Sequence, residues 1–145
     1  MAVELNLGKI KKTDAELKAD VQDIVGEMGG SGGGFDILWT NQNSLTANFL
    51  AQTIPIENIL QYRFYEVLAN GKNIAYKNIV STGKVPINAA TVLFYDEGTT
   101  GVKREINAPT EAGISVAGGV RMNHSSTSHG TANNCLVPYM VLGYK

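Results

Sequence analysis

Cysteine is nearly absent from this sequence, which has only Cys135 among its 145 residues. A single cysteine excludes an intrachain disulfide framework and a CxxC-type metal site, so we expect synthesis in a reducing compartment and a packed thiol. Long apolar runs are absent too: no stretch reaches the roughly 18 residues of a membrane span, and no basic segment leads into an apolar one at the N-terminus. The sequence therefore predicts neither a membrane protein nor an evident secretion signal.

An excess of charge of either sign is also missing, because 12 lysines and arginines are balanced by 13 aspartates and glutamates, for a net charge of -1. Phosphate backbones and anionic lipid surfaces attract proteins through a broad positive field, which this composition does not supply. We therefore expect neither nucleic acid nor a membrane surface as a partner.

Familiar catalytic patterns are missing as well. The sequence has no G-x-S-x-G nucleophile motif, and its glycine-rich run lacks the Lys-Ser/Thr pair of a phosphate-binding loop. Glycan cleavage needs two carboxylates beside the bond, and the candidates lie in or near predicted turns: Asp96, Glu97, Glu105 and Glu111. We expect a protein that is not an enzyme and has no cofactor, with a glycan-cleaving enzyme as the catalytic alternative.

Glycine is concentrated at one point of the chain, where five of the six residues from Gly29 to Gly34 are glycines. Such a run has no side chains to pack and loses much conformational freedom on ordering, so it is typical of a flexible linker. It divides an N-terminal segment, residues 1–28, from a body, residues 35–145, that is long enough for one domain. We predict an attachment segment, a linker at residues 29–34 and one folded domain.

The N-terminal segment contains a helical pattern from Thr13 to Met28, with Thr13 as candidate N-cap and Glu16 completing a capping box. Its apolar residues recur at heptad spacing, which predicts a stripe for trimerisation or attachment: Ile10, Leu17, Val21, Ile24 and Met28. Two interpretations stay open: a short amphipathic helix that packs on its own domain or on a neighbour, and a self-associating bundle. Residues 1–12 alternate like a short strand that could add to another protein's sheet edge, and a frayed terminus is the alternative.

The body changes to a period of two, which is typical of β-strands. Turn signals such as Asn70-Gly71 and Ser81-Thr82-Gly83 separate the alternating runs. About eight short strands at regular spacing predict a mainly β fold, an antiparallel jelly-roll-like β-sandwich preceded by the short N-terminal α-helix. The predicted runs include residues 35–40, 62–68, 74–80, 91–95, 102–106, 114–122 and 136–144.

Local patterns make three sharper predictions. Phe35, Ile37 and Trp39 alternate in phase, so they should share one face, with Trp39 packing in the core. Pro138 lacks a backbone donor, so the last strand should be at an edge or bulged. The Asp96-Glu97-Gly98 sequence predicts a hairpin turn.

A polar stretch of twelve residues, Asn123 to Asn134, separates two predicted strands and contains both histidines of the sequence. Loops of this length without structure are uncommon unless they have a function. We consider a solvated loop whose serines and threonines bond their own backbone, a metal site that would need a third ligand from a symmetric copy, and a contact with a ligand or host surface. The candidate contact residues are His124, Ser126, His129 and Asn133.

Two segments of the body resemble a known group of proteins. Leu38-Trp39-Thr40-Asn41, followed by Asn48-Phe49-Leu50-Ala51-Gln52-Thr53-Ile54, resembles an LWTN…F.AQT signature of small structural proteins from tailed phages of Gram-positive hosts. The closing residues 133–145, NNCLVPYMVLGYK, resemble the N..LIPY.IYGYK terminus of the same group. Together with residues 62–67 and 113–118, the resemblance covers most of residues 36–145.

Members of this group are described as head fibres, capsid decoration proteins, or tail and baseplate appendages. The resemblance implies a homotrimer with a β-sandwich tip, located on the virion after assembly in the host cytoplasm. The implied partners are other copies of the chain and the phage major capsid protein or another virion protein. We expect a capsid decoration or head-fibre protein attached through its N-terminus; the alternative is a tail or baseplate module that recognises host surface polysaccharide.

Overall fold

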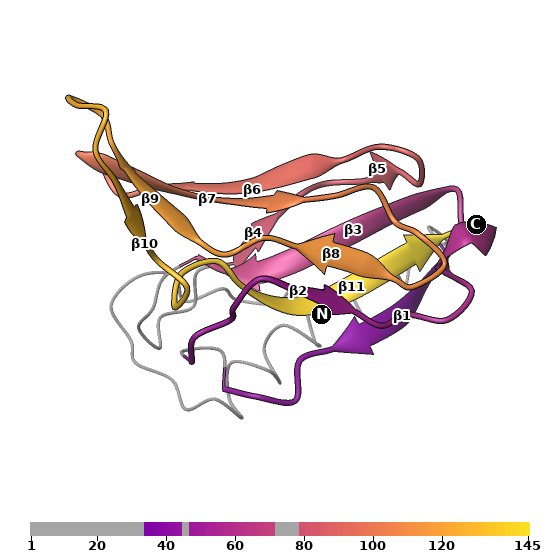
Figure 1. Cartoon of the computed structure of the whole chain (residues 1–145). Helices are drawn as coiled ribbons and strands as arrows, with labels where there is room; N and C mark the ends of the chain where they lie inside the picture. Colours follow the sequence, from indigo (N-terminus) through magenta and orange to yellow (C-terminus); the bar gives the residue numbers. More distant parts are fainter. Residues whose placement is uncertain (1–33, 45–46, 72–78) are drawn as a thin grey trace, which may run out of the picture.

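The computed structural model describes residues 34–44, 47–71 and 79–145, which form two antiparallel β-sheets (Figure 1). The predicted attachment segment, residues 1–28, and the linker residues before Gly34 lie outside the described residues. The described part is mainly β, as predicted, and contains no α-helix. Within the same ranges, no helix has the length and hydropathy needed to cross a bilayer.

The strands of the described residues are short, and a 3-10 turn, η1, precedes the third of them. The elements in chain order are β1 (Phe35–Thr40), β2 (Gln52–Ile54), η1 (Ile59–Gln61), β3 (Phe64–Asn70), β4 (Ile79–Ser81), β5 (Val85–Pro86), β6 (Thr91–Asp96), β7 (Thr100–Ile106), β8 (Ile114–Val116), β9 (Val120–Asn123), β10 (His129–Thr131) and β11 (Val137–Tyr144).

The first sheet has the strand order β1-β11-β3-β4, and β5 also pairs with β3. Its centre is β11, in which all eight residues are buried. On one side Leu142 pairs with Ile37 of β1, and on the other side Val141 pairs with Val67 of β3. The C-terminal segment therefore lies in the middle of the sheet, flanked by a strand from the start of the body.

The second sheet has the order β10-β9-β7-β8-β2, with β6 paired to β7. The register aligns residues from four strands in one row, because Asp96 pairs with Gly101, Gly101 with Met122, and Met122 with His129. Residues at equivalent heights on paired strands share a face of the sheet. This row brings the β6–β7 hairpin and the β9–β10 hairpin together at one end of the sheet.

The two sheets share one hydrophobic core, which takes its side chains from the facing sides of both. The first sheet contributes Tyr65, Val67 and Val141, and the second sheet contributes residues such as Leu93 and Ile114. Burial of apolar surface between two such faces is the main stabilisation of an antiparallel fold of this size.

A second apolar cluster lies on the opposite side of the first sheet. Its buried members come from β3 and β11, with partly buried neighbours from β1, β3 and β4. The cluster consists of Leu68, Tyr139, Met140, Leu142 and Tyr144, with Phe35, Phe64 and Ile79 packed against it. The first sheet is therefore mainly apolar on both faces, and we call this second face, which also carries the buried Glu66, the outer face of the first sheet.

The prediction that Phe35, Ile37 and Trp39 share one face is wrong. The pairing of β1 with β11 shifts register between Ile37 and Trp39, which marks a β-bulge. A bulge adds one residue and reverses the alternation beyond it. Phe35 therefore packs in the outer cluster, whereas Trp39 packs on the shared core, as predicted, and meets Phe49 edge-on with ring centroids 6.4 Å apart.

Pro138 was predicted to lie in an edge strand or at a bulge, and the edge is wrong because β11 is central in its sheet. The bulge is confirmed: the pairing of β11 with β3 shifts register between Pro138 and Met140. The side chain of Asn41 donates to the Pro138 carbonyl at 2.9 Å, and the Asn41 backbone donates to Tyr139 at 2.8 Å. The bulge thus accommodates the missing proline donor inside the sheet.

Two other strand predictions change in detail. The run 114–122 is two strands, β8 and β9, interrupted at residues 117–119. Of the run 74–80, the structure describes only Ile79 and Val80, which belong to β4.

The turn at Asp96-Glu97-Gly98 is confirmed. Gly98 has a positive φ of 96°, and its backbone donates to the Asp96 carboxylate at 2.7 Å. The Glu97 backbone donates to the Thr100 carbonyl at 2.7 Å and closes the hairpin. Positive φ at the glycine is what allows so short a connection between β6 and β7.

Candidate functional site

The predicted contact loop is partly a β-hairpin. Its second half forms β10, which pairs with β9, so the expectation of a long stretch without regular structure is wrong there. The turn is held by its own side chains: Asn123 Oδ1 accepts from the Ser125 backbone at 2.9 Å, and Ser126 Oγ accepts from the Ser128 backbone at 3.2 Å. These local bonds are the ones expected of a solvated polar turn.

The tip of this hairpin contacts the neighbouring β6–β7 turn, and the two tips lie at the same end of the molecule (Figure 1). The backbone of His124 donates to the Thr99 carbonyl at 3.1 Å. Its ring atom Nε2 lies 3.9 Å from Asp96 Oδ1, and both side chains are exposed. The structure therefore connects a predicted contact residue, His124, with a carboxylate from a different hairpin.

An aromatic side chain completes this surface. Phe94 is 47% exposed and its ring lies against Gly101. A Cβ at Gly101 would meet two atoms of the Phe94 ring at 2.8 Å and His124 Nε2 at 3.2 Å. Gly101 thus leaves the space in which the Phe94 ring and the His124 ring approach each other.

We call this surface the hairpin face and define it by Phe94, Asp96, Gly101, His124 and His129. His129 belongs to it because it is in the same row as Asp96 and Gly101. An exposed aromatic ring offers a stacking surface, and imidazole and carboxylate groups offer hydrogen bonds. The arrangement can bind a polar ligand that also has a flat apolar face. Among the described residues, no group of three His, Cys, Asp or Glu side chains could hold a metal ion.

Two shallow hollows adjoin His129, with volumes of about 240 and 260 Å³. The first is lined in part by Arg121, whose Nε donates to Glu97 Oε2 at 3.2 Å and whose Nη2 lies 3.3 Å from Cys135 Sγ. The hydrogen bond to the Glu97 carboxylate raises the pKa of the Arg121 guanidinium. Arg121 is therefore held in position beneath the hairpin.

Asn133 and Ser126 lie at opposite ends of the β9–β10 hairpin. Ser126 is exposed in the turn, whereas the side chain of Asn133 accepts from the Gly119 backbone at 2.9 Å. The Asn133 carbonyl accepts from Arg104 at 3.0 Å. The structure thus brings His124 and His129 to the hairpin face and places Asn133 apart from them, in a structural contact.

Arg104 is the centre of that contact and is fully buried. Its guanidinium donates to four backbone carbonyls, at distances of 2.7 to 3.0 Å, and lies 5.5 Å from the centre of the Phe49 ring; the carbonyls belong to Phe49, Ala117, Asn133 and Cys135. Burial lowers the pKa of Arg104 to about 10, and the nearby Cys135 opposes this shift. One side chain therefore joins three segments that are distant in sequence, around Phe49, Ala117 and residues 133–135.

Cys135 itself is buried and free. Its position beside Arg121 and the Arg104-bound backbone fits the predicted role of a small packed residue.

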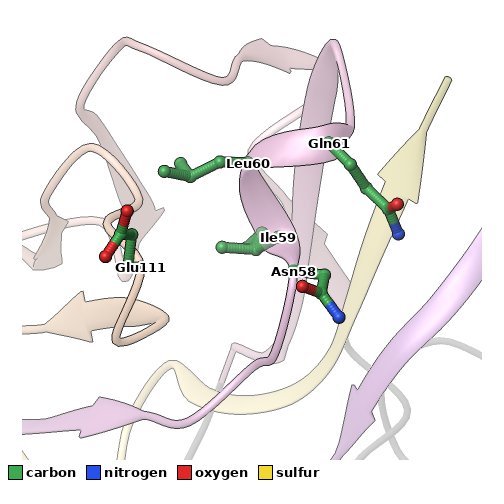
Figure 2. A pocket seen from close by; sticks show the side chains of 5 residues that line it. All are labelled: Asn58, Ile59, Leu60, Gln61 and Glu111. Carbon is green, nitrogen blue, oxygen red and sulfur yellow. The ribbon is translucent and has the colours of Figure 1, made fainter.

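A larger hollow of about 380 Å³ lies away from the hairpin face, between η1 and the turn before β8. Figure 2 shows Leu60 and Glu111 directed toward one another across this space, while Gln61 points away from it. Among its described lining residues, Glu111 is the one side chain with a charge. These described lining residues include neither paired carboxylates nor a nucleophile with a base.

Sequence reasoning missed Phe94, Gly101 and Arg104. The signal for Arg104 was present, because it alternates in phase with Val102 and Ile106, and a charged residue at an apolar position of a strand indicates a buried polar contact. Phe94 and Gly101 had no local signal, because their contact depends on the register between β6 and β7. The predicted association residues, at positions 10, 17, 21, 24 and 28, lie outside the described residues.

Comparison with known proteins adds no relative: no family model, no curated protein and no solved structure gives a significant match to this chain.

Proposed function

We propose that this protein is a bacteriophage virion structural protein, a trimeric capsid decoration or head-fibre protein that projects from the particle surface. In this proposal residues 1–28 attach it, and the body is a jelly-roll-like β-sandwich that acts without catalysis. The proposal rests on the two sequence segments that resemble phage structural proteins, residues 38–54 and 133–145.

One observation carries the proposal, namely that the two segments are neighbours in space and depend on each other. Asn41 of the first segment bonds to Pro138 and Tyr139 of the second. Arg104 then joins the Phe49 carbonyl of the first segment to the Cys135 carbonyl of the second. The signature residues therefore form one structural unit, which is what a shared fold requires of residues separated by about 90 positions in the chain.

The test is binding of the purified full-length protein to particles of the phage that encodes it. We expect it to sediment with empty capsids and to be absent from the tail fraction, as followed by quantitative gel analysis. The double change Val3→Asp with Leu5→Asp should abolish sedimentation by interrupting the apolar alternation of the attachment segment, whereas Glu4→Gln should leave it unchanged. Sedimentation with tails or with host cells only would reject the capsid assignment.

A second candidate function is recognition of a host surface polysaccharide, and the hairpin face favours it. Sugar rings stack on exposed aromatic side chains and accept hydrogen bonds from imidazole groups. On this candidate, Phe94→Ala should reduce binding of the protein to host cells, whereas Val92→Ala, an exposed apolar residue on the same strand, should leave it unchanged. Equal binding by both variants and the original protein would reject the hairpin face as a receptor site.

A further inference from the structure

The outer face of the first sheet is mainly apolar and nevertheless buried, and its buried carboxylate, Glu66, accepts a hydrogen bond from the Tyr144 hydroxyl at 2.7 Å. Met140 and Leu142 have no exposed surface, and Leu68 is 4% exposed. The second sheet cannot cover them, because it packs on the opposite side, against the shared core (Figure 1). Among the described elements, none belongs to a layer on the outer face.

The buried zone has a sharp boundary. Leu142 is fully buried, but Ile37, its pairing partner on β1, is 53% exposed. On the far side of β3, Ser81 of β4 is exposed although it pairs with the buried Leu68. Phe35 of β1 and Ile79 of β4 are partly buried at the rim of this zone, so the fully covered zone is about two strands wide, or roughly 10 Å, which is the width of one α-helix and narrower than a second sheet.

We infer that the helix predicted over residues 13–28 packs on this face of its own chain, with Leu17, Val21, Ile24 and Met28 against β3 and β11. A helix of this length extends roughly 24 Å, close to the roughly 26 Å of the eight-residue strand β11. The apolar stripe of the helix and the apolar zone of the sheet then cover each other.

The point at which the described chain begins supports the same occupant. The residues after Met28 lead directly into β1, whose first residue, Phe35, lies on the outer face beside Tyr144 with ring centroids 5.9 Å apart. A linker of six residues spans up to roughly 20 Å, which is enough for the helix to fold back over the sheet. A helix that is connected to the body at Phe35 can therefore cover this face without a second copy of the chain.

This inference goes beyond the proposed function and does not depend on it. It assigns the apolar stripe to a contact within one chain, so that assembly of copies relies on the body and the proposed attachment segment narrows from residues 1–28 to residues 1–12. The experiment below therefore tests the helix contact whatever the function of the protein is.

The experiment uses a reporter thiol, Leu142→Cys, in a full-length chain in which Cys135→Ser removes the native thiol. Its labelling by a water-soluble maleimide should be slow, and adding Leu17→Asp with Ile24→Asp should accelerate labelling by about 100-fold as the helix detaches. Ala19→Asp with Gln22→Asp adds the same charge on the opposite side of the helix and should leave the rate unchanged. If Leu142→Cys does not fold, Met140→Cys is the reporter.

A crosslink then identifies which chain supplies the helix. In the Cys135→Ser background, the pair Val21→Cys with Leu142→Cys should form an intrachain disulfide under mild oxidation, seen as a faster-migrating monomer on a non-reducing gel, and Ala19→Cys with Leu142→Cys should give far less of it. A product of dimer mass would overturn the inference in favour of a second copy. Labelling that stays slow after Leu17→Asp with Ile24→Asp would also overturn it, because another segment would then cover the face.

Discussion

The two sheets have contrasting outer faces. On the first sheet, the face turned away from the shared core is apolar and buried along β3 and β11. On the second sheet, the corresponding face has exposed residues of mixed chemistry, among them Val92, Phe94 and His129. The same alternation of residues along a strand can therefore produce two kinds of outer face. The first face is a packing surface, and the second is a surface available to a ligand or another molecule.

Both faces depend on the core between the sheets, so the largest loss should follow from Arg104→Leu. This change removes the guanidinium donors of four backbone carbonyls, of which the Asn133 carbonyl keeps the Phe49 backbone as a donor, and should reduce the free energy of unfolding by about 4 kcal/mol, as measured by urea denaturation. The control Arg63→Leu removes an exposed arginine and should change stability by less than about 0.5 kcal/mol. Similar losses for both variants would show that Arg104 does not organise the core.

The contrast between the faces themselves is tested by matched truncations. Leu142→Ala on the buried face should reduce the free energy of unfolding by about 3 kcal/mol, because it removes buried methyl groups and leaves a cavity. Val92→Ala on the exposed face should cost less than about 0.5 kcal/mol. If urea denaturation gave the same loss of unfolding free energy for both variants, the two faces would not differ in packing.

Alkaline pH should act on the first sheet through its tyrosines. Burial raises the pKa of Tyr65 from its ordinary 10.0 to about 12, and burial together with the hydrogen bond to Glu66 raises the pKa of Tyr144. A raised folded-state pKa means that the unfolded chain loses its proton first, so the associated stability is complete below pH 10 and decreases as pH rises through the folded pKa.

We therefore expect the free energy of unfolding to fall between pH 10 and pH 12, and Tyr65→Phe or Tyr144→Phe should each flatten that decrease. Urea denaturation at several pH values measures it. A decrease that is the same in both variants and in the original chain would assign the effect to other groups.

The smallest effect should come from Gly101→Ala on the hairpin face. The added methyl group must displace the exposed Phe94 ring, which can move into solvent, so we expect a loss of about 0.5 kcal/mol. In a double-mutant cycle with Phe94→Ala, the cost of Gly101→Ala should decrease, because the obstructing ring is gone. A cost that does not depend on Phe94 would contradict the contact between the two residues.

Much of the described fold was predictable from local patterns. The alternation of Val102 and Ile106 marked β7, and the Asp96-Glu97-Gly98 turn marked its hairpin with β6, because both signals arise within a few residues. The failures occurred where long-range pairing decides the outcome. No local pattern shows that the strand with Pro138 is central, and the bulge that separates Ile37 from Trp39 is visible only in the pairing with β11.

The candidate site was predictable only in part for the same reason. His124 and His129 were identified because two histidines in a long polar stretch are conspicuous in sequence. Phe94 lies on the same face because of the register of three strand pairs. Asn133 is not part of that face, because its side chain accepts from the Gly119 backbone and its carbonyl accepts from Arg104. Residue type selects candidates, whereas strand register decides which of them meet.

The sequence by itself determined a β body with short strands and the turn between β6 and β7, because strand alternation and the conformational freedom of glycine act locally. Only the tertiary structure decided which apolar residues face the shared core and which form the outer face of the first sheet. The physical reason is that alternation is symmetric: it separates the two sides of a strand but does not label either one as inner. That assignment comes from partners distant in the chain, as Arg104 shows by joining carbonyls from three separate segments.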